Sequence, residues 1–286
     1  MGCHTRNMFK TIACDCDLHV LADSIVQAGL KEAIATTPNI TVFGPKNKAL
    51  CKFLQANPGA DLASVLTYHV LSESLKSKDL VNDQKYVTLS GDSVRTNQYS
   101  CPTFNKVTTV NGVPLSEKNI HASNGILHKI GKVLVPPTGT VAQIVTENPD
   151  FSILLQAVLA ADPAVLALLS DPNANLTVFA PTNQAFESLA SELGLSLAEI
   201  LALPNLTNIL LYHVLTLSLG AVFSAAIREG KTKNVPTLAE QDITFCRCGK
   251  KIYIKDANDR KSKVIGADVL VTNGVVHVID KVLLPL

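Results

Sequence analysis

The stretch TVFAPTNQAF, residues 177–186, predicts a β-strand that turns directly into an α-helix. Its β-branched and aromatic start indicates a short buried strand, and the Ala-Pro pair that follows ends this strand. Thr182 or Asn183 can cap the helix, which carries Phe186 and Leu189 toward the interior. The other features of the chain can be positioned against this strand-to-helix corner.

The same corner occurs a second time, nearer the start of the chain. Residues 41–50 read TVFGPKNKAL and begin 177 − 41 = 136 residues earlier; Lys46 replaces the Thr, so that the cap is left to Asn47. A repeat of about 140 residues matches the usual size of a domain, roughly 100–150 residues. The 286 residues therefore predict two domains built from one duplicated unit.

Helical segments flank both corners. Residues 8–35 predict one or two helices, and their counterpart in the second half is residues 141–169. After each corner follows an apolar segment that ends in Tyr-His-Val-Leu, and Asp61 and Asn205 are the predicted N-caps of these helices. The same order of elements is therefore expected in both halves.

The last third of each half alternates apolar and polar residues with the period of two that predicts β-strands. Each half then closes with Asn-Gly between apolar residues. Asn-Gly is the strongest two-residue hairpin signal, because both positions of a type I′ turn need positive φ. We therefore expect each half to end in a tight antiparallel hairpin. The strand-like segments are residues 87–94, 106–112, 242–245 and 251–255, and the Asn-Gly pairs are residues 124–125 and 273–274.

The corner, the Tyr-His-Val-Leu segment and the Asn-Gly hairpin, in this order and twice over, resemble the fasciclin (FAS1) domain. We therefore expect two tandem FAS1 domains, residues 1–137 and 138–286. The resemblance implies an α+β fold in which each domain is a wedge of two small β-sheets flanked by helices. It also implies a role in adhesion or extracellular assembly, and no catalysis.

The resemblance further implies two partner-binding segments, since an Asp-Ile pair before the hairpin and the Tyr-His segment are associated with integrin binding in relatives. The first half has Asn119 where the acidic residue belongs. The residues themselves favour another interpretation of the histidines, which lie in apolar surroundings where buried rings bond to backbone groups. By the same reasoning His128 and His277 alternate with apolar residues and face the interior. The candidate partner-binding residues are Tyr68, His69, Tyr212, His213, Asp268 and Val269.

The charges argue against some classes of partner. The chain has 25 Lys and Arg against 24 Asp and Glu and no basic run, which gives no electrostatic reason to expect nucleic acid or an anionic membrane. No apolar stretch reaches the roughly 18 residues needed to span a bilayer. The start of the chain lacks the apolar core of a secretory signal, so an exported protein would contain this chain in a processed or truncated form.

Seven cysteines beside three Asn-x-Ser/Thr triplets favour an oxidising, glycosylating route, and we expect a secreted protein at an extracellular or cell-surface location. Two Cys-x-Cys pairs lie in different halves and differ from the Cys-x2-Cys of common zinc sites, so disulfides are favoured over a metal. Their pairing stays open. The glycosylation candidates are Asn39, Asn175 and Asn205, and the disulfide candidates are Cys14, Cys16, Cys51, Cys101, Cys246 and Cys248.

No arrangement of residues indicates catalysis or a cofactor. The chain has no Gly-x-Ser-x-Gly, phosphate-binding loop or His-Glu-x-x-His motif. We therefore predict a non-enzymatic protein of adhesion or of surface or matrix assembly. Its partners would be other extracellular or cell-surface proteins or glycans, within a larger surface assembly. The alternative is a carrier of a small apolar ligand, such as a carotenoid, in a cleft between the helices and the sheet.

Overall fold

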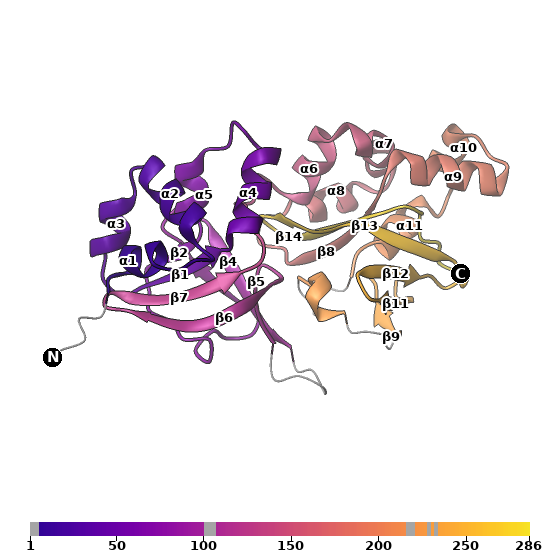
Figure 1. The fold of residues 1–286 in the computed structure, drawn as a ribbon. Helices are drawn as coiled ribbons and strands as arrows, with labels where there is room; N and C mark the ends of the chain where they lie inside the picture. Colours follow the sequence, from indigo (N-terminus) through magenta and orange to yellow (C-terminus); the bar gives the residue numbers. More distant parts are fainter. Residues whose placement is uncertain (1–5, 100–106, 216–220, 228–229, 232–233) are drawn as a thin grey trace. The chain divides into compact units, whose positions relative to one another are not determined.

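The structure, a computed structural model, describes residues 6–99, 107–215, 221–227, 230–231 and 234–286 (Figure 1). It divides into two compact units, Met1–Pro136 and Pro137–Leu286, one residue before the predicted boundary. Each unit contains one corner and one terminal hairpin, and each is described by itself below.

Both strand-to-helix corners form as predicted. In the first unit, strand β1 (Ile40–Pro45) leads into helix α4 (Asn47–Ala56), and in the second unit strand β8 (Leu176–Pro181) leads into helix α9 (Asn183–Leu193). All six residues of each strand are buried, in agreement with their apolar and β-branched composition. The corner is therefore a core element of each unit.

The strands of the first unit form one hydrogen-bonded path in the order β2-β1-β7-β6-β5-β4-β3. Besides β1, they are β2 (Val70–Leu71), β3 (Gln84–Val87), β4 (Ser93–Tyr99), β5 (Val107–Val110), β6 (Val113–Ala122) and β7 (Gly125–Ile130). Strands β1 and β7 are parallel, and the other pairs are antiparallel. The long strand β6 pairs with β5 at its start and with β7 further on, so it joins the two small sheets.

The second unit repeats this topology. Its path runs β10-β11-β12-β13-β14-β8, with β9 paired to β11. Strand β8 is parallel to β14, as β1 is to β7, and β13 takes the place of β6. The strands are β9 (Gly230–Lys231), β10 (Val235–Pro236), β11 (Asp242–Cys248), β12 (Lys251–Lys255), β13 (Lys261–Val271) and β14 (Gly274–Ile279).

Helices cover one side of the parallel strand pair in each unit (Figure 1). Residues 8–35 contain two full helices and most of a third, which ends at Thr36, instead of the one or two predicted. Apolar side chains between helices and sheet are buried, among them Met8, Leu50, Phe186 and Leu189. Besides α4 and α9, the helices are α1 (Met8–Ala13), α2 (His19–Gln27), α3 (Lys31–Thr36), α5 (Leu62–Thr67), α6 (Val141–Glu147), α7 (Ser152–Ala160), α8 (Pro163–Ser170), α10 (Leu197–Leu201) and α11 (Leu206–Tyr212), with 3₁₀ turns η1 (Pro149–Phe151) and η3 (Ser224–Ala226).

The cap of the corner helix differs from the prediction in the first unit. Thr182 caps α9 as expected, but Lys46 occupies the N-cap of α4 without a side-chain hydrogen bond, so the predicted cap by Asn47 is wrong. Asn47 instead accepts a hydrogen bond from the N–H of Val20 (3.0 Å) and donates to the carbonyl of Cys16 (2.8 Å). It therefore ties the preceding helices to the corner.

Of the two remaining predicted caps, the one in the first unit makes its capping bond and the one in the second unit does not. Asp61 caps α5 with its carboxylate, which accepts from two backbone N–H groups. Asn205 occupies the N-cap of α11 but makes no side-chain capping bond. Capping position is therefore predicted better than the capping bond.

Both terminal hairpins form, but not with the predicted type I′ turn. Gly125 already pairs with Ala122, so the loop residues are 123 and 124, and Asn124 is not among the described residues with positive φ. The glycine is required for a different reason, because a Cβ on Gly125 would lie 2.0 Å from the carbonyl oxygen of Ile40. A Cβ on Gly274 would lie 2.1 Å from the carbonyl oxygen of Leu176.

The asparagine of each Asn-Gly pair connects the hairpin to the helices. Asn124 accepts from the N–H of Met8 (2.7 Å) and donates to the carbonyls of Ile34 (3.0 Å) and Thr37 (2.8 Å). Asn273 makes the same three bonds, from Val141 and to Leu169 and Asp171. A turn with positive φ at both positions does occur at Asn111 (46°) and Gly112 (75°), between β5 and β6.

Candidate functional site

The Tyr-His segment of the second unit lies where α11 ends. The Tyr212 hydroxyl donates to the carbonyl of Asp242 (2.9 Å) and accepts from the N–H of Ala257 (2.9 Å). The side chain is fully buried, and this burial raises the pKa of Tyr212 to about 12. Tyr212 thereby connects the helix to β11 and to the turn after β12.

His213 is saturated by backbone groups in the interior. Its Nε2 accepts from the N–H of Leu283 (2.9 Å), so the proton is on Nδ1, which donates to the carbonyl of Ile209 (2.7 Å). The residue is 3% exposed, and burial lowers the pKa of His213 to about 4. The imidazole is therefore neutral at neutral pH and holds the end of the chain against α11.

The first unit has the same arrangement. Tyr68 donates to the carbonyl of Ser93 (3.0 Å) and accepts from the Asn111 amide (2.9 Å), and burial raises the pKa of its hydroxyl. His69 bonds to the Val65 carbonyl (2.7 Å) and the Leu134 N–H (2.9 Å), and burial lowers its pKa to about 4. A partner could reach these four side chains only after the unit had opened.

Asp268 and Val269 lie at a β-bulge in β13. Asp268 has a positive φ of 61°, and its carboxylate accepts hydrogen bonds from the N–H (2.7 Å) and the hydroxyl of Ser224. Its own N–H donates to Nδ1 of His277 (3.3 Å). The neighbouring Val269 is 37% exposed. The bulge thus fixes the loop around Ser224 and presents Val269 to solvent.

The first unit builds the same bulge without a carboxylate. Asn119 has φ of 61° and accepts from the N–H of Ser77 (2.8 Å), while its amide donates to the Ser77 hydroxyl (3.1 Å). Its N–H donates to Nδ1 of His128 (3.2 Å). The position therefore has a structural role that either Asp or Asn can perform.

The second pair of histidines is also internal, as the alternation predicts. His277 Nε2 donates to the carbonyl of Val222 (2.9 Å), and His128 Nε2 donates to that of Leu75 (3.0 Å). Burial lowers the pKa of both rings; for His277 the Asp268 carboxylate opposes part of this effect. The candidate residues therefore do not form one site. Asp268 is hydrogen-bonded to His277, whereas Tyr212 is hydrogen-bonded to Asp242.

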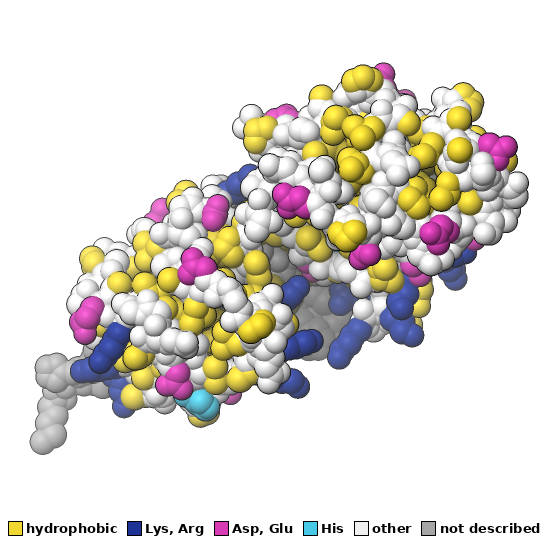
Figure 2. All heavy atoms as spheres, turned by 90° about the horizontal axis from the view of Figure 1, so that it is seen from above, with side chains coloured by type: hydrophobic (Ala, Val, Ile, Leu, Met, Phe, Trp, Pro, Cys, Tyr) yellow, Lys and Arg dark blue, Asp and Glu magenta, His cyan; other side chains and the backbone are white. Residues whose placement is uncertain are grey.

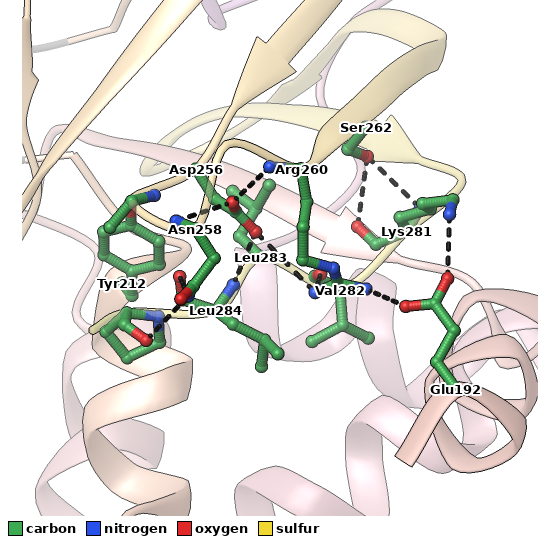
Figure 3. A network of polar contacts seen from close by, with 12 residues as sticks. Glu192, Tyr212, Asp256, Asn258, Arg260, Ser262, Lys281, Val282, Leu283 and Leu284 are labelled. Atoms are coloured by element: carbon green, nitrogen blue, oxygen red, sulfur yellow. Dashed lines mark hydrogen bonds and ion pairs between the residues drawn. The ribbon is translucent and has the colours of Figure 1, made fainter.

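The second unit contains a polar network that was not predicted from the sequence (Figure 3). The buried Asp256 carboxylate accepts from the N–H groups of Asn258 (3.0 Å), Arg260 (2.9 Å) and Leu284 (3.1 Å). Arg260 also donates to the carbonyl of Val282 (3.1 Å) and pairs with Glu192. The turn at residues 256–260 therefore holds the segment around Leu284 in place.

The modification candidates are placed on or near the surface. Asn39 and Asn205 are exposed, whereas Asn175 is half-buried and its Oδ1 is buried. Five cysteines carry free thiols, so the disulfides stay a prediction, and Cys101 lies outside the described residues. The five are Cys14, Cys16, Cys51, Cys246 and Cys248.

The described residues of the second unit form an open hollow of about 440 Å³, lined by residues that include Thr146 and Leu166. The cavity in the first unit is far smaller. An apolar cavity between α2 and β1, lined by residues that include Ile25, Phe43 and His69, has a volume of about 10 Å³. One water molecule would fill it, whereas small-molecule pockets measure roughly 300–1,000 Å³. In the part of the chain that is described, no three His, Cys, Asp or Glu residues form a metal-binding group.

The chain belongs to the fasciclin domain family, whose model matches residues 17–136 and 149–285. This confirms the predicted family and, together with the two mixed α+β units, the predicted fold class. None of the described helices is long and apolar enough to cross a membrane.

The relatives include animal and bacterial proteins. Transforming growth factor-beta-induced protein ig-h3 of Sus scrofa is 29% identical over 256 residues, which is 86% of this chain and 35% of that protein. Periostin of Homo sapiens is 28% identical over 90% of this chain and 29% of its own length. Protein sll1483 of a Synechocystis strain is 37% identical over 51% of this chain and 73% of its own length. The chain thus spans about a third of the length of these two mammalian relatives.

The chain is also similar to a solved structure that is described as a FAS1 domain pair from the insect cell adhesion molecule fasciclin I. Its TM-score is 0.48 and its identity 19%, over 94% of this chain and 97% of the solved one.

Proposed function

We propose that the chain is a non-enzymatic protein of adhesion or of extracellular matrix or surface assembly, acting through contacts of its two FAS1 domains with proteins or glycans. Membership of the fasciclin family supports this role. The observation that carries the proposal is the state of the motif side chains. His69 and His213 are buried and use both ring nitrogens on backbone groups, which leaves neither ring free as an acid or base.

The contact surface that we propose is the bulge of the second domain. Asp268 is held by Ser224, and this fixed backbone presents Val269 at the surface. A contact made by one exposed side chain is weak by itself. Two linked domains that engage together gain avidity without any new contact.

An extracellular location completes the proposal. The exposed side chains of Asn39 and Asn205 are accessible to glycan attachment, and so is the half-buried Asn175 to a lesser extent. Disulfides that involve the six candidate cysteines belong to the same proposal. The cavity of the first domain is too small for a carotenoid-type ligand, and the hollow of the second domain is open and lined mainly by polar residues, so neither favours the alternative of a carrier.

Attachment of coated beads to cells of the source organism tests this function. We expect wild-type chain to promote attachment, and Val269→Ser to reduce it severalfold. Val26→Ser is the matched control, because Val26 is an exposed valine (53%) on α2 of the first domain and should leave attachment unchanged.

Two results would overturn the proposal. One is attachment by the folded wild-type chain no greater than by albumin-coated beads. The other is turnover of an ester or peptide probe that disappears with substitution of a single residue.

A further inference from the structure

The charges of the second domain are strongly segregated. Residues 137–227 contain seven Asp or Glu and no Lys or Arg, a net charge of −7. Residues 228–286 contain eleven Lys or Arg and seven Asp or Glu, which gives 11 − 7 = +4. Figure 2 looks onto the helices and shows carboxylates there, with Lys and Arg at the margin of this domain. The near-zero charge of the whole chain conceals this division.

The basic residues of the sheet share one face. The register pairs Tyr253 with Lys263 and with Cys246, and it pairs Lys255 with Lys261. Lys251, Tyr253 and Lys255 alternate with Ile252 and Ile254, which are buried in the core on the other face. We call Lys251, Lys255, Lys261 and Lys263, arranged around Tyr253, the lysine face.

The charges of the lysine face are largely uncompensated. Lys255 pairs with Asp259 at 2.5 Å. Among the described residues, the ammonium groups of Lys251, Lys261 and Lys263 have no carboxylate partner within 4 Å. By contrast, Lys281 pairs with Glu192 at 2.8 Å and serves the network of Figure 3. Lys261 and Lys263 are about 7 Å apart along one strand, and Lys251 lies diagonally across from Lys263 on the neighbouring strand. These three free cations attract an anion with repeated charges.

We propose that the lysine face binds a linear sulfated polysaccharide. A row of lysines on two neighbouring strands suits an extended chain that lies across the strands. Its sulfates would pair with several ammonium groups, and a sugar ring would pack on Tyr253. Proteins bind single-stranded nucleic acid by stacking its bases on several aromatic side chains, whereas the lysine face has one, Tyr253. The choice of a glycan over nucleic acid rests on the proposed extracellular function.

The first domain offers an internal comparison. Aligned through the strand registers, Val107, Thr109 and Pro114 stand where the second domain has Lys251, Tyr253 and Lys263. The same sheet position therefore carries no charge in the first domain. Binding should be confined to the second.

Titration of the full chain with a heparin decasaccharide at several salt concentrations tests the inference. The triple variant Lys251→Gln, Lys261→Gln, Lys263→Gln should weaken binding about tenfold or more and reduce the slope of log K against log salt by about two. The control triple Lys10→Gln, Lys48→Gln, Lys52→Gln removes the same charge from exposed sites of the first domain and should bind as wild type.

Three outcomes would overturn the inference. They are no binding of heparin by the folded chain, an equal loss in both triple variants, and preference for a polyglutamate peptide or a single-stranded oligonucleotide over heparin. The bead assay separates this result from the proposed function. If beads attach to cells but heparin does not bind, only the proposal for the lysine face is contradicted. If heparin binds but beads do not attach, only the proposed adhesion role is contradicted.

Discussion

The two domains repeat the same interior hydrogen bonds but differ in their charged side chains. The motif histidine, the hairpin asparagine and the bulge residue make corresponding bonds in both domains. The tyrosine hydroxyl accepts from the Asn111 amide in the first domain and from the Ala257 N–H in the second. At the position of Lys129, whose ammonium lies 2.6 Å from Asp15 and 2.9 Å from Glu117, the second domain has Val278. On the outer sheet face the difference is reversed, and the second domain carries the lysines.

This difference shows which positions the fold constrains. A buried polar group costs free energy unless it is paired, so each interior bond constrains both of its partners. An outward-facing strand position has no such requirement and can gain or lose a charge at little cost to stability. The duplicated domains therefore share one scaffold and can present different surfaces.

The hairpin glycines provide the strongest test of the shared scaffold. We expect Gly125→Ala and Gly274→Ala each to lower the free energy of unfolding of its own domain by about 4 kcal/mol or more, because the added methyl group would collide with the carbonyl of the parallel strand. Denaturant unfolding followed by hydrogen exchange would assign each loss to a domain.

Gly131→Ala is the matched control, because a Cβ there meets nothing within 4 Å. It should change stability by less than about 0.5 kcal/mol. Comparable losses at Gly131 and Gly125, or a loss at Gly125 that appears in the second domain, would contradict the assigned role of the hairpin glycine.

Acid should destabilise both domains in the same pH window. His69 and His213 have an ordinary pKa of 6.5 and a pKa of about 4 in the folded protein. The unfolded chain therefore binds protons first, and stability is intact above about pH 6.5 and is lost as the pH falls toward 4. At pH 5 the loss is about 2 kcal/mol for each histidine, with further losses from His128 and His277 in the same direction.

His69→Gln sharpens this test in the first domain. The variant should be less stable at pH 7 but should lose less stability between pH 6.5 and 5, whereas exposed His121→Gln should follow wild type. A wild-type free energy of unfolding that is constant from pH 7 to 5 would contradict the neutral, buried state of these rings.

The smallest effect is expected at the bulge. Asp268→Asn gives the second domain the residue that the first has at Asn119, so stability should change by about 1 kcal/mol or less. Loss of the carboxylate should lower the pKa of His277 further, since Asp268 favours its charged form. An NMR titration of His277 measures this shift. A rise in the pKa would show that the two side chains do not interact.

The sequence predicted the duplicated scaffold because its signals are local. The corner, the caps at Thr182 and Asp61, and the hairpin positions follow from residues close together in the chain. The turn type was wrong because Gly125 is required by a strand 85 residues away (125 − 40 = 85), beside Ile40. Glycine is favoured both where φ is positive and where another backbone approaches closely. Only the strand register shows which of these two reasons applies.

The candidate site was less predictable for a related reason. Apolar surroundings indicated internal histidines, and the structure places all four there. The lysine face could not be predicted from the charge count, because strand pairing gathers Lys251, Lys261 and Lys263 from two strands onto one face. The network at Asp256 depends on contacts between the turn and the end of the chain, which no local pattern reveals.

The parallel pairing of β1 with β7, and of β8 with β14, has a consequence for synthesis on the ribosome. Each domain closes its sheet with its last strand, so the first can be complete once residues 125–130 have emerged, well before residues 274–279 are made. The two copies would then fold in succession, which limits the time in which a strand of one copy could insert into the other.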